Sequence, residues 1–286
     1  MVRRVGVLVA VIAAVAVALT SVFLTTRPTA ARRPTAPRPI ASGQPLPSAT
    51  PVSTVTPHGP PGDWAPTFDD EFNGTELDTS RWSTCSPNMQ QNPCSGWGGE
   101  LETYDAQNVS VSGGSLHLTA RHEDSGYTSG MVSTYGTFSF EYGYMEVSMK
   151  VPAGQGLWPA AWAFGTDLVP PDELDDIEVL GGDPHTALVT VHYPGGQVSQ
   201  HLAQAANLSA GYHTFGLDWE PHHLSWYIDG NPVSESITDP SKIPHKPMFL
   251  LLDLAVGGDF GGPPNASTSF PASMGVNYIR VFEPAS

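Results

Sequence analysis

The chain has 286 residues, and its 28 acidic and 12 basic side chains give a formal net charge of −16. All 28 acidic residues but only 6 basic ones lie after residue 62, so this part carries a net charge of −22; that charge argues against nucleic acid and sulfated polysaccharides as partners and leaves neutral polymers open. With 29 Gly, 28 Pro and only 14% charged residues, the composition favours turn-rich β structure over helices.

The N-terminus carries an export signal. Arg3 and Arg4 precede roughly 20 mostly apolar residues, Val5–Leu24, a pattern typical of secretion and also long enough to span a bilayer. Two interpretations stay open for residues 1–24: a signal peptide that is cleaved, or a membrane anchor that is retained. In both cases we expect the protein to be extracellular, either secreted or anchored at the cell surface.

Residues 25–62 form a predicted linker. The segment is rich in Pro, Thr and Ala, with ten prolines from Pro28 to Pro61, and it cannot bury enough apolar surface to fold. We expect a disordered spacer that tethers the rest of the protein at a distance from a membrane or cell wall. Residues 63–286 are enough for one domain with its own hydrophobic core.

The sequence after residue 62 consists of short β-type runs separated by turns. NVSVSGGSLHL alternates around a Gly-Gly turn, which predicts a β-hairpin. The predicted strands lie within Asn108–Ala120, Thr137–Val151, Ala187–Tyr193, Tyr212–Trp219, Leu224–Ile228, Met248–Val256 and Val276–Phe282. Many short strands with regular turns indicate an all-β fold, a β-sandwich or jelly roll in one domain.

The chain contains two cysteines, Cys85 and Cys94, in a loop rich in Pro, Asn and Gln. Their spacing suits one short disulfide in an oxidising compartment. Two isolated thiols cannot form a Cys-rich zinc site.

The segment ELDDIE contains a row of carboxylates on a predicted strand. Side chains alternate along a strand, so Glu173 and Asp175 share a face, and Glu178 joins them only if a β-bulge at Asp176-Ile177 inserts one residue. Two glutamates on one face can approach to about 5–5.5 Å, the separation that a glycosidase needs for double displacement with retained configuration. A solvated acidic edge strand and a calcium loop are the alternatives, although the segment lacks the ligand order of an EF-hand.

Aromatic side chains surround this acidic segment in the sequence. Trp158 and Trp162 lie four residues apart just before it, and Trp97 and Tyr104 flank Glu100. Indole faces can stack on pyranose rings, although residue type alone favours core filling. We interpret Trp219 and Trp226 as core residues.

Together these strings resemble glycoside hydrolase family 16, the laminarinase-like β-glucanases. The similarity covers about residues 66–283 and rests on FDDEFNGTELDTSRW, ELETYDAQNVSVSGGSLHLTA, YTSGMVSTYGTFSFEYGYMEV, GLWPAAW, ELDDIE, YHTFGLDWEPHHLSWYIDG, PMFLLLDLAVGG and FPASMGVNYIRV. It implies a concanavalin A-like jelly roll of two antiparallel sheets with the active strand on the concave face.

The resemblance also implies roles for individual residues. Glu173 corresponds to the nucleophile, Glu178 to the acid/base and Asp175 to an assisting residue. The two tryptophans of GLWPAAW would lie beside the cleft with Glu100 and Trp97, and His192 would lie near the acid/base, although a lone His is otherwise more often structural. No cofactor is required, and a structural calcium at Glu71 and Asn277 is an open alternative.

The sequence departs from the family pattern at five positions, which bear on the substrate rather than on the reaction type. Asp176 replaces a usually aliphatic residue, so that it either reaches solvent at the bulge or raises the pKa of its neighbours. The other four are Met131 for Arg, Gly99 for Asn, Asp253 for Asn and Asn277 for Asp.

We therefore expect a monomeric, exported, endo-acting retaining β-glycosidase that hydrolyses a neutral polysaccharide, β-1,3-glucan or mixed β-1,3/1,4-glucan. A transglycosylase on the same glucans is the nearest alternative, because the same machinery can transfer a glycosyl unit to a sugar. A non-catalytic glycan-binding module and a structural surface protein are further alternatives. The intact carboxylate row argues against both.

Overall fold

The computed structural model describes residues 55–285 except 86–93, 97 and 205. The predicted signal or anchor and most of the predicted linker lie outside these residues, as does Trp97. In the part of the chain that is described, no helix is long and apolar enough to cross a membrane.

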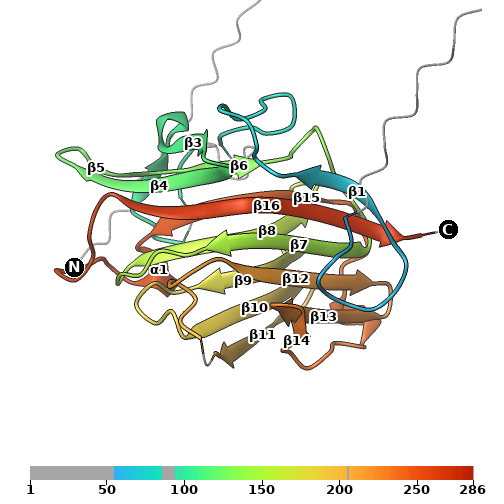
Figure 1. Ribbon diagram of the computed structural model, residues 1–286. Coiled ribbons are helices and arrows are strands. Elements are labelled where there is room, and N and C mark those ends of the chain that lie inside the picture. The colour runs from blue at the N-terminus through green and yellow to red at the C-terminus, as the bar shows by residue number, and fades with distance from the viewer. Residues whose placement is uncertain (1–54, 86–93, 97, 205, 286) are drawn as a thin grey trace, which may run out of the picture. The chain divides into compact units, whose positions relative to one another are not determined.

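Within these residues the strands form two sheets, and the fold is the predicted all-β jelly roll (Figure 1). The ten-stranded sheet contains β1 (Trp64–Asp70), β2 (Glu102–Tyr104), β3 (Val109–Ser112), β4 (Ser115–Glu123), β5 (Gly126–Ser129), β7 (Gly143–Lys150), β12 (His213–Glu220), β13 (His223–Ile228), β14 (Asn231–Pro232) and β16 (Ala272–Pro284). The six-stranded sheet runs in the order β11 (Gly196–Ala203), β10 (Thr186–Tyr193), β9 (Glu173–Val179), β8 (Leu157–Gly165), β15 (Met248–Val256) and β6 (Met131–Ser133).

Helical structure is confined to short turns. They are α1 (Gly258–Gly261) and the 3-10 turns η1 (Ala106–Asn108) and η2 (Pro240–Lys242). The strand pairs are antiparallel apart from β2 with β5.

The core lies between the two sheets because side chains alternate along each strand. In β8, Leu157, Ala161 and Ala163 enter the core, whereas Trp158 and Trp162 point to the opposite face. The same alternation in β9 and β15 leaves the outer face of the six-stranded sheet free for a cleft.

The predicted strands and the hairpin are confirmed with small changes of boundary. Ser112 pairs with Ser115, and both Gly113 and Gly114 have positive φ (62° and 78°), as a two-residue hairpin turn requires. In contrast, only Gly143–Lys150 of the long predicted strand is extended, since the residues before it form turns and an isolated bridge.

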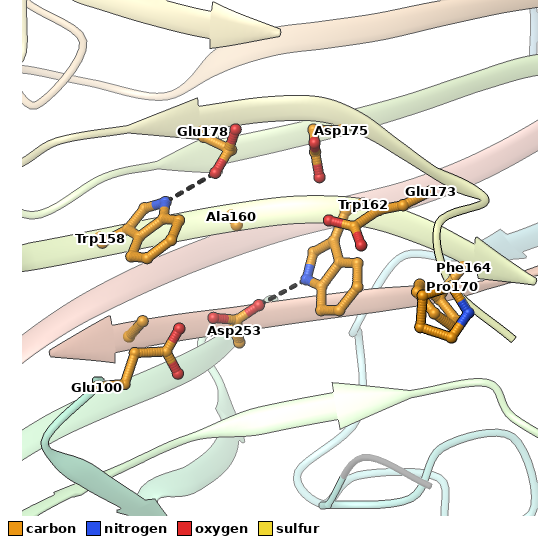
Figure 2. Close-up of a pocket in the computed structure, with 11 residues that line it drawn as sticks. Glu100, Trp158, Ala160, Trp162, Phe164, Pro170, Glu173, Asp175, Glu178 and Asp253 are labelled. Carbon is orange, nitrogen blue, oxygen red and sulfur yellow. Dashed lines mark hydrogen bonds between the residues drawn. The ribbon is translucent and has the colours of Figure 1, made fainter. Parts of the chain in front are cut away.

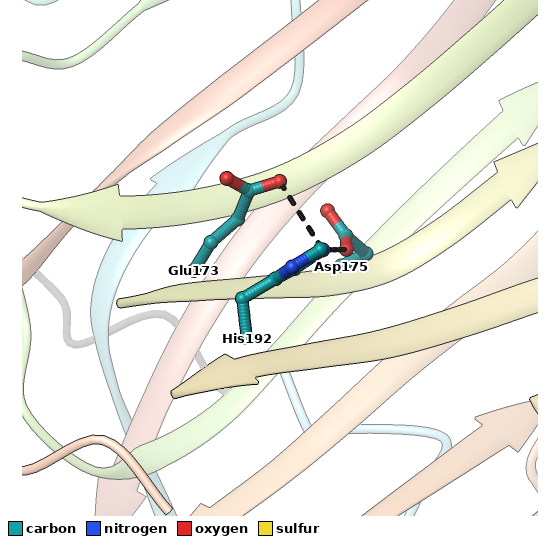
Figure 3. A group of neighbouring side chains, drawn as sticks. All are labelled: Glu173, Asp175 and His192. Atoms are coloured by element: carbon teal, nitrogen blue, oxygen red, sulfur yellow. Dashed lines mark ion pairs between the residues drawn. The ribbon is translucent and has the colours of Figure 1, made fainter. Parts of the chain in front are cut away.

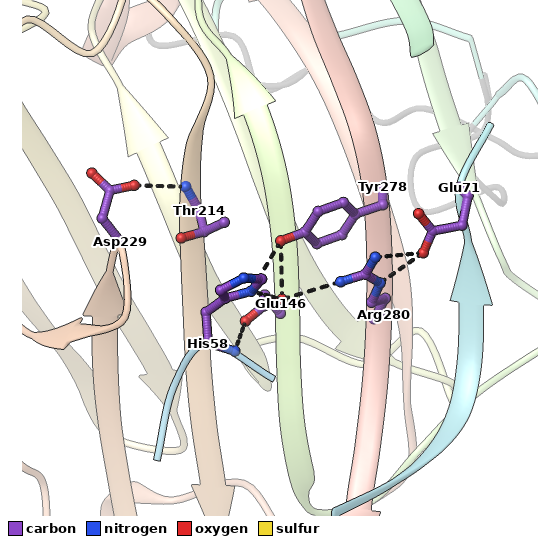
Figure 4. Close-up of polar contacts among 7 residues, drawn as sticks. All are labelled: His58, Glu71, Glu146, Thr214, Asp229, Tyr278 and Arg280. Atoms are coloured by element: carbon purple, nitrogen blue, oxygen red, sulfur yellow. Dashed lines mark hydrogen bonds and ion pairs between the residues drawn. The ribbon is translucent and has the colours of Figure 1, made fainter. Parts of the chain in front are cut away.

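The ordered domain begins upstream of residue 63. Pro60 is buried and its carbonyl accepts a hydrogen bond from the Trp64 indole at 3.1 Å. The His58 amide donates to the buried carboxylate of Glu146 on β7 at 2.6 Å (Figure 4). Residues 55–62 therefore pack on the outer face of the ten-stranded sheet instead of continuing the spacer.

The predicted calcium position is arranged around an ion pair instead. Both Nε and Nη2 of Arg280 lie 2.7 Å from Oε1 of Glu71 (Figure 4), and Asn277 accepts a hydrogen bond from the Ser115 hydroxyl at 2.8 Å. A guanidinium on this carboxylate opposes a second positive charge, so these residues do not fit a calcium ion. Elsewhere in the domain, Cys85 and Cys94 are joined by a disulfide bond.

Candidate active site

A β-bulge in β9 places the acidic side chains on one face. In the pairing with β8, Ala161 lies opposite Ile177 and Trp162 opposite Asp175, which leaves Asp176 as the extra residue. The pairing with β10 shifts at the same place. As a result Glu173, Asp175 and Glu178 all line the outer cleft, as the bulge predicted (Figure 2).

The bulge is held from behind by the opposite sheet. The indole N–H of Trp226 on β13 donates to the carbonyl oxygen of Asp175 at 2.9 Å. Trp226 and Trp219 are both buried, as predicted, but the sequence did not reveal that Trp226 supports the acidic strand. Its partner is 51 residues away in the chain, and no local pattern indicates that contact.

Asp176 does not reach solvent, so the first interpretation of this residue was wrong. It is 1% exposed, and neither carboxyl oxygen has a hydrogen-bond partner among the described residues. Burial, followed by the nearby charge of Glu146, raises the pKa of Asp176 well above its usual value. The bulge thus turns this carboxyl away from the cleft into apolar surroundings.

The cleft has two arms that meet at the acidic row. The first, here called the aromatic arm, is a cavity of about 320 Å³. Besides the three carboxyls it is lined by Glu100, Trp158, Ala160, Trp162, Phe164, Pro170, Asp253 and Ala255 (Figure 2). Apolar surface with a few polar groups is typical of a site for a carbohydrate ring.

The second arm, here called the polar arm, extends over β10 and β11. It has a volume of about 360 Å³ and shares the three carboxyls and Trp158 with the aromatic arm. Gln197, Ser199 and His201 alternate along β11 and line this arm with hydrogen-bonding groups. Sequence reasoning missed these three residues, although their spacing of two is itself the signal of a shared face.

Burial perturbs all three carboxyls of the row. It raises the pKa of Glu173 well above its usual value, and the adjacent Asp175 charge adds to this effect. Burial likewise raises the pKa of Asp175 and of Glu178, while the indole N–H of Trp158, 3.0 Å from Glu178 Oε1, opposes the shift of Glu178. Because like charges oppose one another at this spacing, the row favours a mixture of protonated and ionised carboxyls.

The domain matches the model of Glycosyl hydrolases family 16 over residues 100–279. The chain belongs to this family. It is 33% identical over 254 residues to glucan endo-1,3-beta-glucosidase A1 of Niallia circulans, and 34% identical over 240 residues to endo-1,3-1,4-beta-glycanase EglC of Rhizobium meliloti. These alignments cover 75% and 76% of the chain but 37% and 51% of the relatives, so the chain spans about half of their length or less.

Solved structures agree with this family 16 assignment. The endo-beta-1,3-glucanase from Pyrococcus furiosus is 33% identical, with a TM-score of 0.71, and the match covers 81% of this chain and all of that one. The laminarinase catalytic domain from Thermotoga maritima is 33% identical, with a TM-score of 0.69, over 78% of this chain and all of that one.

In this family 16 domain, His192 lies against a different part of the row than expected. Its Nε2 is 3.3 Å from Asp175 Oδ2 and 3.8 Å from Glu173 Oε1 (Figure 3). His192 pairs directly with Glu173 across β9 and β10, so it faces the predicted nucleophile instead of the predicted acid/base. Among the described residues, these three form the one group of such side chains close enough, within 4.8 Å, to hold a cation.

The remaining predicted subsite residues divide between the cleft and its floor. Glu100 lines the aromatic arm together with Trp158 and Trp162. Met131, where relatives often have Arg, is fully buried beside Asp253 and cannot contact a sugar. The role of Asp253 in the floor, where it binds Trp162, was not predicted.

Proposed function

We propose that the protein is an endo-acting, retaining β-glucanase that hydrolyses β-1,3-glucan or mixed β-1,3/1,4-glucan. The observation that carries the proposal is the bulged β9, which presents Glu173, Asp175 and Glu178 in one row at the junction of two open arms. The names of the relatives, which include 1,3- and 1,3-1,4-glucanases, support the choice of polymer.

The mechanism needs the two glutamates in different protonation states. Glu173 attacks the anomeric carbon as a carboxylate and forms a glycosyl-enzyme ester, while Glu178 gives its proton to the leaving oxygen. Glu178 then takes a proton from water, which attacks the ester and releases Glu173. The raised pKa of Glu178 favours the acid form needed in the first step. His192 and Asp175 flank Glu173 and balance its charge.

The two open arms suit an endo-acting enzyme because a polymer can pass through the junction. On the aromatic arm, Trp158 offers its indole to a pyranose ring. On the polar arm, Gln197, Ser199 and His201 offer hydrogen bonds to sugar hydroxyls. A neutral glucan avoids the repulsion that the acidic domain would exert on a polyanion.

Transglycosylation is the second candidate, and the polar arm favours it. A sugar bound there by its hydroxyls could replace water as the acceptor in the second step. Asp175, Glu173 and Glu178 serve both reactions, so occupancy of this arm decides between them.

We also propose that the protein is exported and works outside the cytoplasm, either free or tethered by residues 1–62. The apolar run after two arginines supports export, and the Cys85–Cys94 disulfide is compatible with an oxidising compartment. Expression of the full chain with a C-terminal tag, followed by fractionation and N-terminal sequencing, distinguishes cleavage from retention.

The activity is tested by reducing-sugar release from laminarin, mixed-linkage glucan and agarose. We expect release from one or both glucans by the wild type, loss in Glu173→Gln, and full activity in the exposed control Glu123→Gln. With azide, Glu173→Ala should yield the α-glycosyl azide and Glu178→Ala the β-glycosyl azide, which assigns the two roles. Activity that persists in Glu173→Gln would refute the assignment.

A further inference from the structure

Asp253 is a buried carboxylate in the floor of the aromatic arm. It lies in the middle of β15 and is 5% exposed. Its Oδ1 accepts the indole N–H of Trp162 at 2.7 Å (Figure 2), and its Oδ2 accepts the hydroxyl of Tyr104 at 3.1 Å. Each oxygen is therefore committed to one aromatic side chain.

Trp162 is the partner through which Asp253 can affect the cleft. The indole is 6% exposed and lines the aromatic arm from below, close to the acidic row. It is packed in a small apolar cluster with Tyr104, Met131, Ala160, Phe164, Phe249 and Leu251. Apolar packing sets the plane of the ring, but only a hydrogen bond fixes the direction of its N–H.

We propose that Asp253 is a positioning residue, whose carboxylate locks the Trp162 indole as the floor of the glucan-binding aromatic arm. The inference rests on the proposed glucanase function and adds a determinant of substrate binding to it. An N–H bond to an ionised carboxylate is about twice as strong as a neutral one, so the charge state of Asp253 controls how firmly the floor is held.

The surroundings of Asp253 are all neutral or acidic. From β2 it faces Tyr104 and Glu102, and from β9 the charges of Asp175 and Glu178 act on it. The neighbouring strands β8 and β6 contribute Trp162 and Met131, which do not titrate in the working range.

Burial, opposed by the bonds from the two aromatic partners, raises the pKa of Asp253 to about 7. Above this pH the carboxylate is ionised and holds Trp162 by a charge-assisted bond. Below it, one oxygen carries a proton, the bond with Tyr104 must reverse its direction, and the hold on Trp162 weakens. We therefore expect substrate binding to weaken as the pH falls through about 7.

The test measures kcat and KM on soluble laminarin at about pH 8 and about pH 6, one unit on each side of the transition. Asp253→Asn keeps an acceptor for Trp162 and offers an N–H to Tyr104, so it mimics the protonated state. For the wild type we expect KM to rise about tenfold from the higher to the lower pH. Asp253→Asn should have the raised KM at both pH values, with kcat changed less than about twofold.

A matched control comes from the far side of the domain. Asp70 on β1 accepts the indole N–H of the buried Trp82 at 2.8 Å and lines neither arm. Asp70→Asn should keep the wild-type KM at both pH values, even if it lowers stability. If Asp253→Asn retains the wild-type dependence of KM on pH, the inference is overturned.

A second readout does not depend on catalysis. The fluorescence of Trp162, taken as the difference between wild type and Trp162→Phe, should change between about pH 6 and 8, and this change should be absent in Asp253→Asn. Fluorescence coupling without sugar release from any glucan would refute the proposed function and leave the Asp253–Trp162 link standing. Sugar release without fluorescence coupling would refute the inference alone.

Discussion

Replacement of Asp176 should stabilise the protein. The carboxyl is 1% exposed, both of its oxygens lack a partner, and Glu146 raises its pKa further. Asp176 lies on the bulge between two residues of the acidic row but lines neither arm of the cleft. Asp176→Leu and Asp176→Asn should therefore change stability and leave kcat/KM within about twofold of the wild type.

The size of the effect follows from the titration of this group. In the unfolded chain the carboxyl loses its proton near pH 3.8, whereas the folded protein keeps it to well above that value. Between these values the folded state binds one more proton, so each pH unit lowers the unfolding free energy by about 1.4 kcal/mol. Over two units the loss is about 3 kcal/mol. Asp176→Leu also removes two unpartnered polar atoms, which adds about 1–3 kcal/mol at any pH.

The assay is urea unfolding of each variant at about pH 5 and about pH 7, both above the unfolded value of 3.8. Relative to wild type, both variants should gain about 3 kcal/mol more at the higher pH, because only the charge titrates. The exposed Asp124→Asn serves as the control and should show no gain. Equal pH dependence in wild type and Asp176→Asn would refute the reasoning.

Three further predictions concern the acidic row. Trp226→Phe removes the bond that holds the bulge and should lower kcat about tenfold, whereas Trp219→Phe, which loses a bond to Pro244 instead, should lower only the unfolding free energy measured in urea. His192→Gln removes a positive charge that lowers the pKa of the predicted nucleophile, so the acid limb of the kcat/KM profile should move to higher pH. Trp158→Phe removes a bond that lowers the pKa of the acid/base, so the basic limb should move to higher pH; an unmoved limb in either profile contradicts the contact.

Local patterns were sufficient to predict the acidic strand and its neighbours. Alternation in Met248–Val256 and around Gly113-Gly114 reflects contacts within one strand or one hairpin, and the structure confirms both. The bulge was predictable because ELDDIE has one residue too many for its carboxyls to share a face. In each case the information lies within about ten residues of sequence.

Contacts between distant segments could not be predicted. The direction of the Asp176 side chain depends on Glu146 in the other sheet, and the bond from Tyr104 to Asp253 spans 149 residues. The early start of the domain depends on the same Glu146, which binds His58 over 88 residues. A proline-rich composition describes a segment in isolation and does not reveal a surface that receives it.

The pairing of the first and last strands determines how the domain connects to other polypeptide. Trp64 lies opposite Pro284, and the amide of Ala285 donates to the carbonyl of Asp63 at 2.8 Å, so both ends of the domain leave from neighbouring points on the ten-stranded sheet (Figure 1). The cleft occupies the outer face of the other sheet. Sequence fused at either end, by design or in longer proteins, leaves the path of an insoluble polymer through the cleft unobstructed, and the domain can be moved between architectures as a cassette.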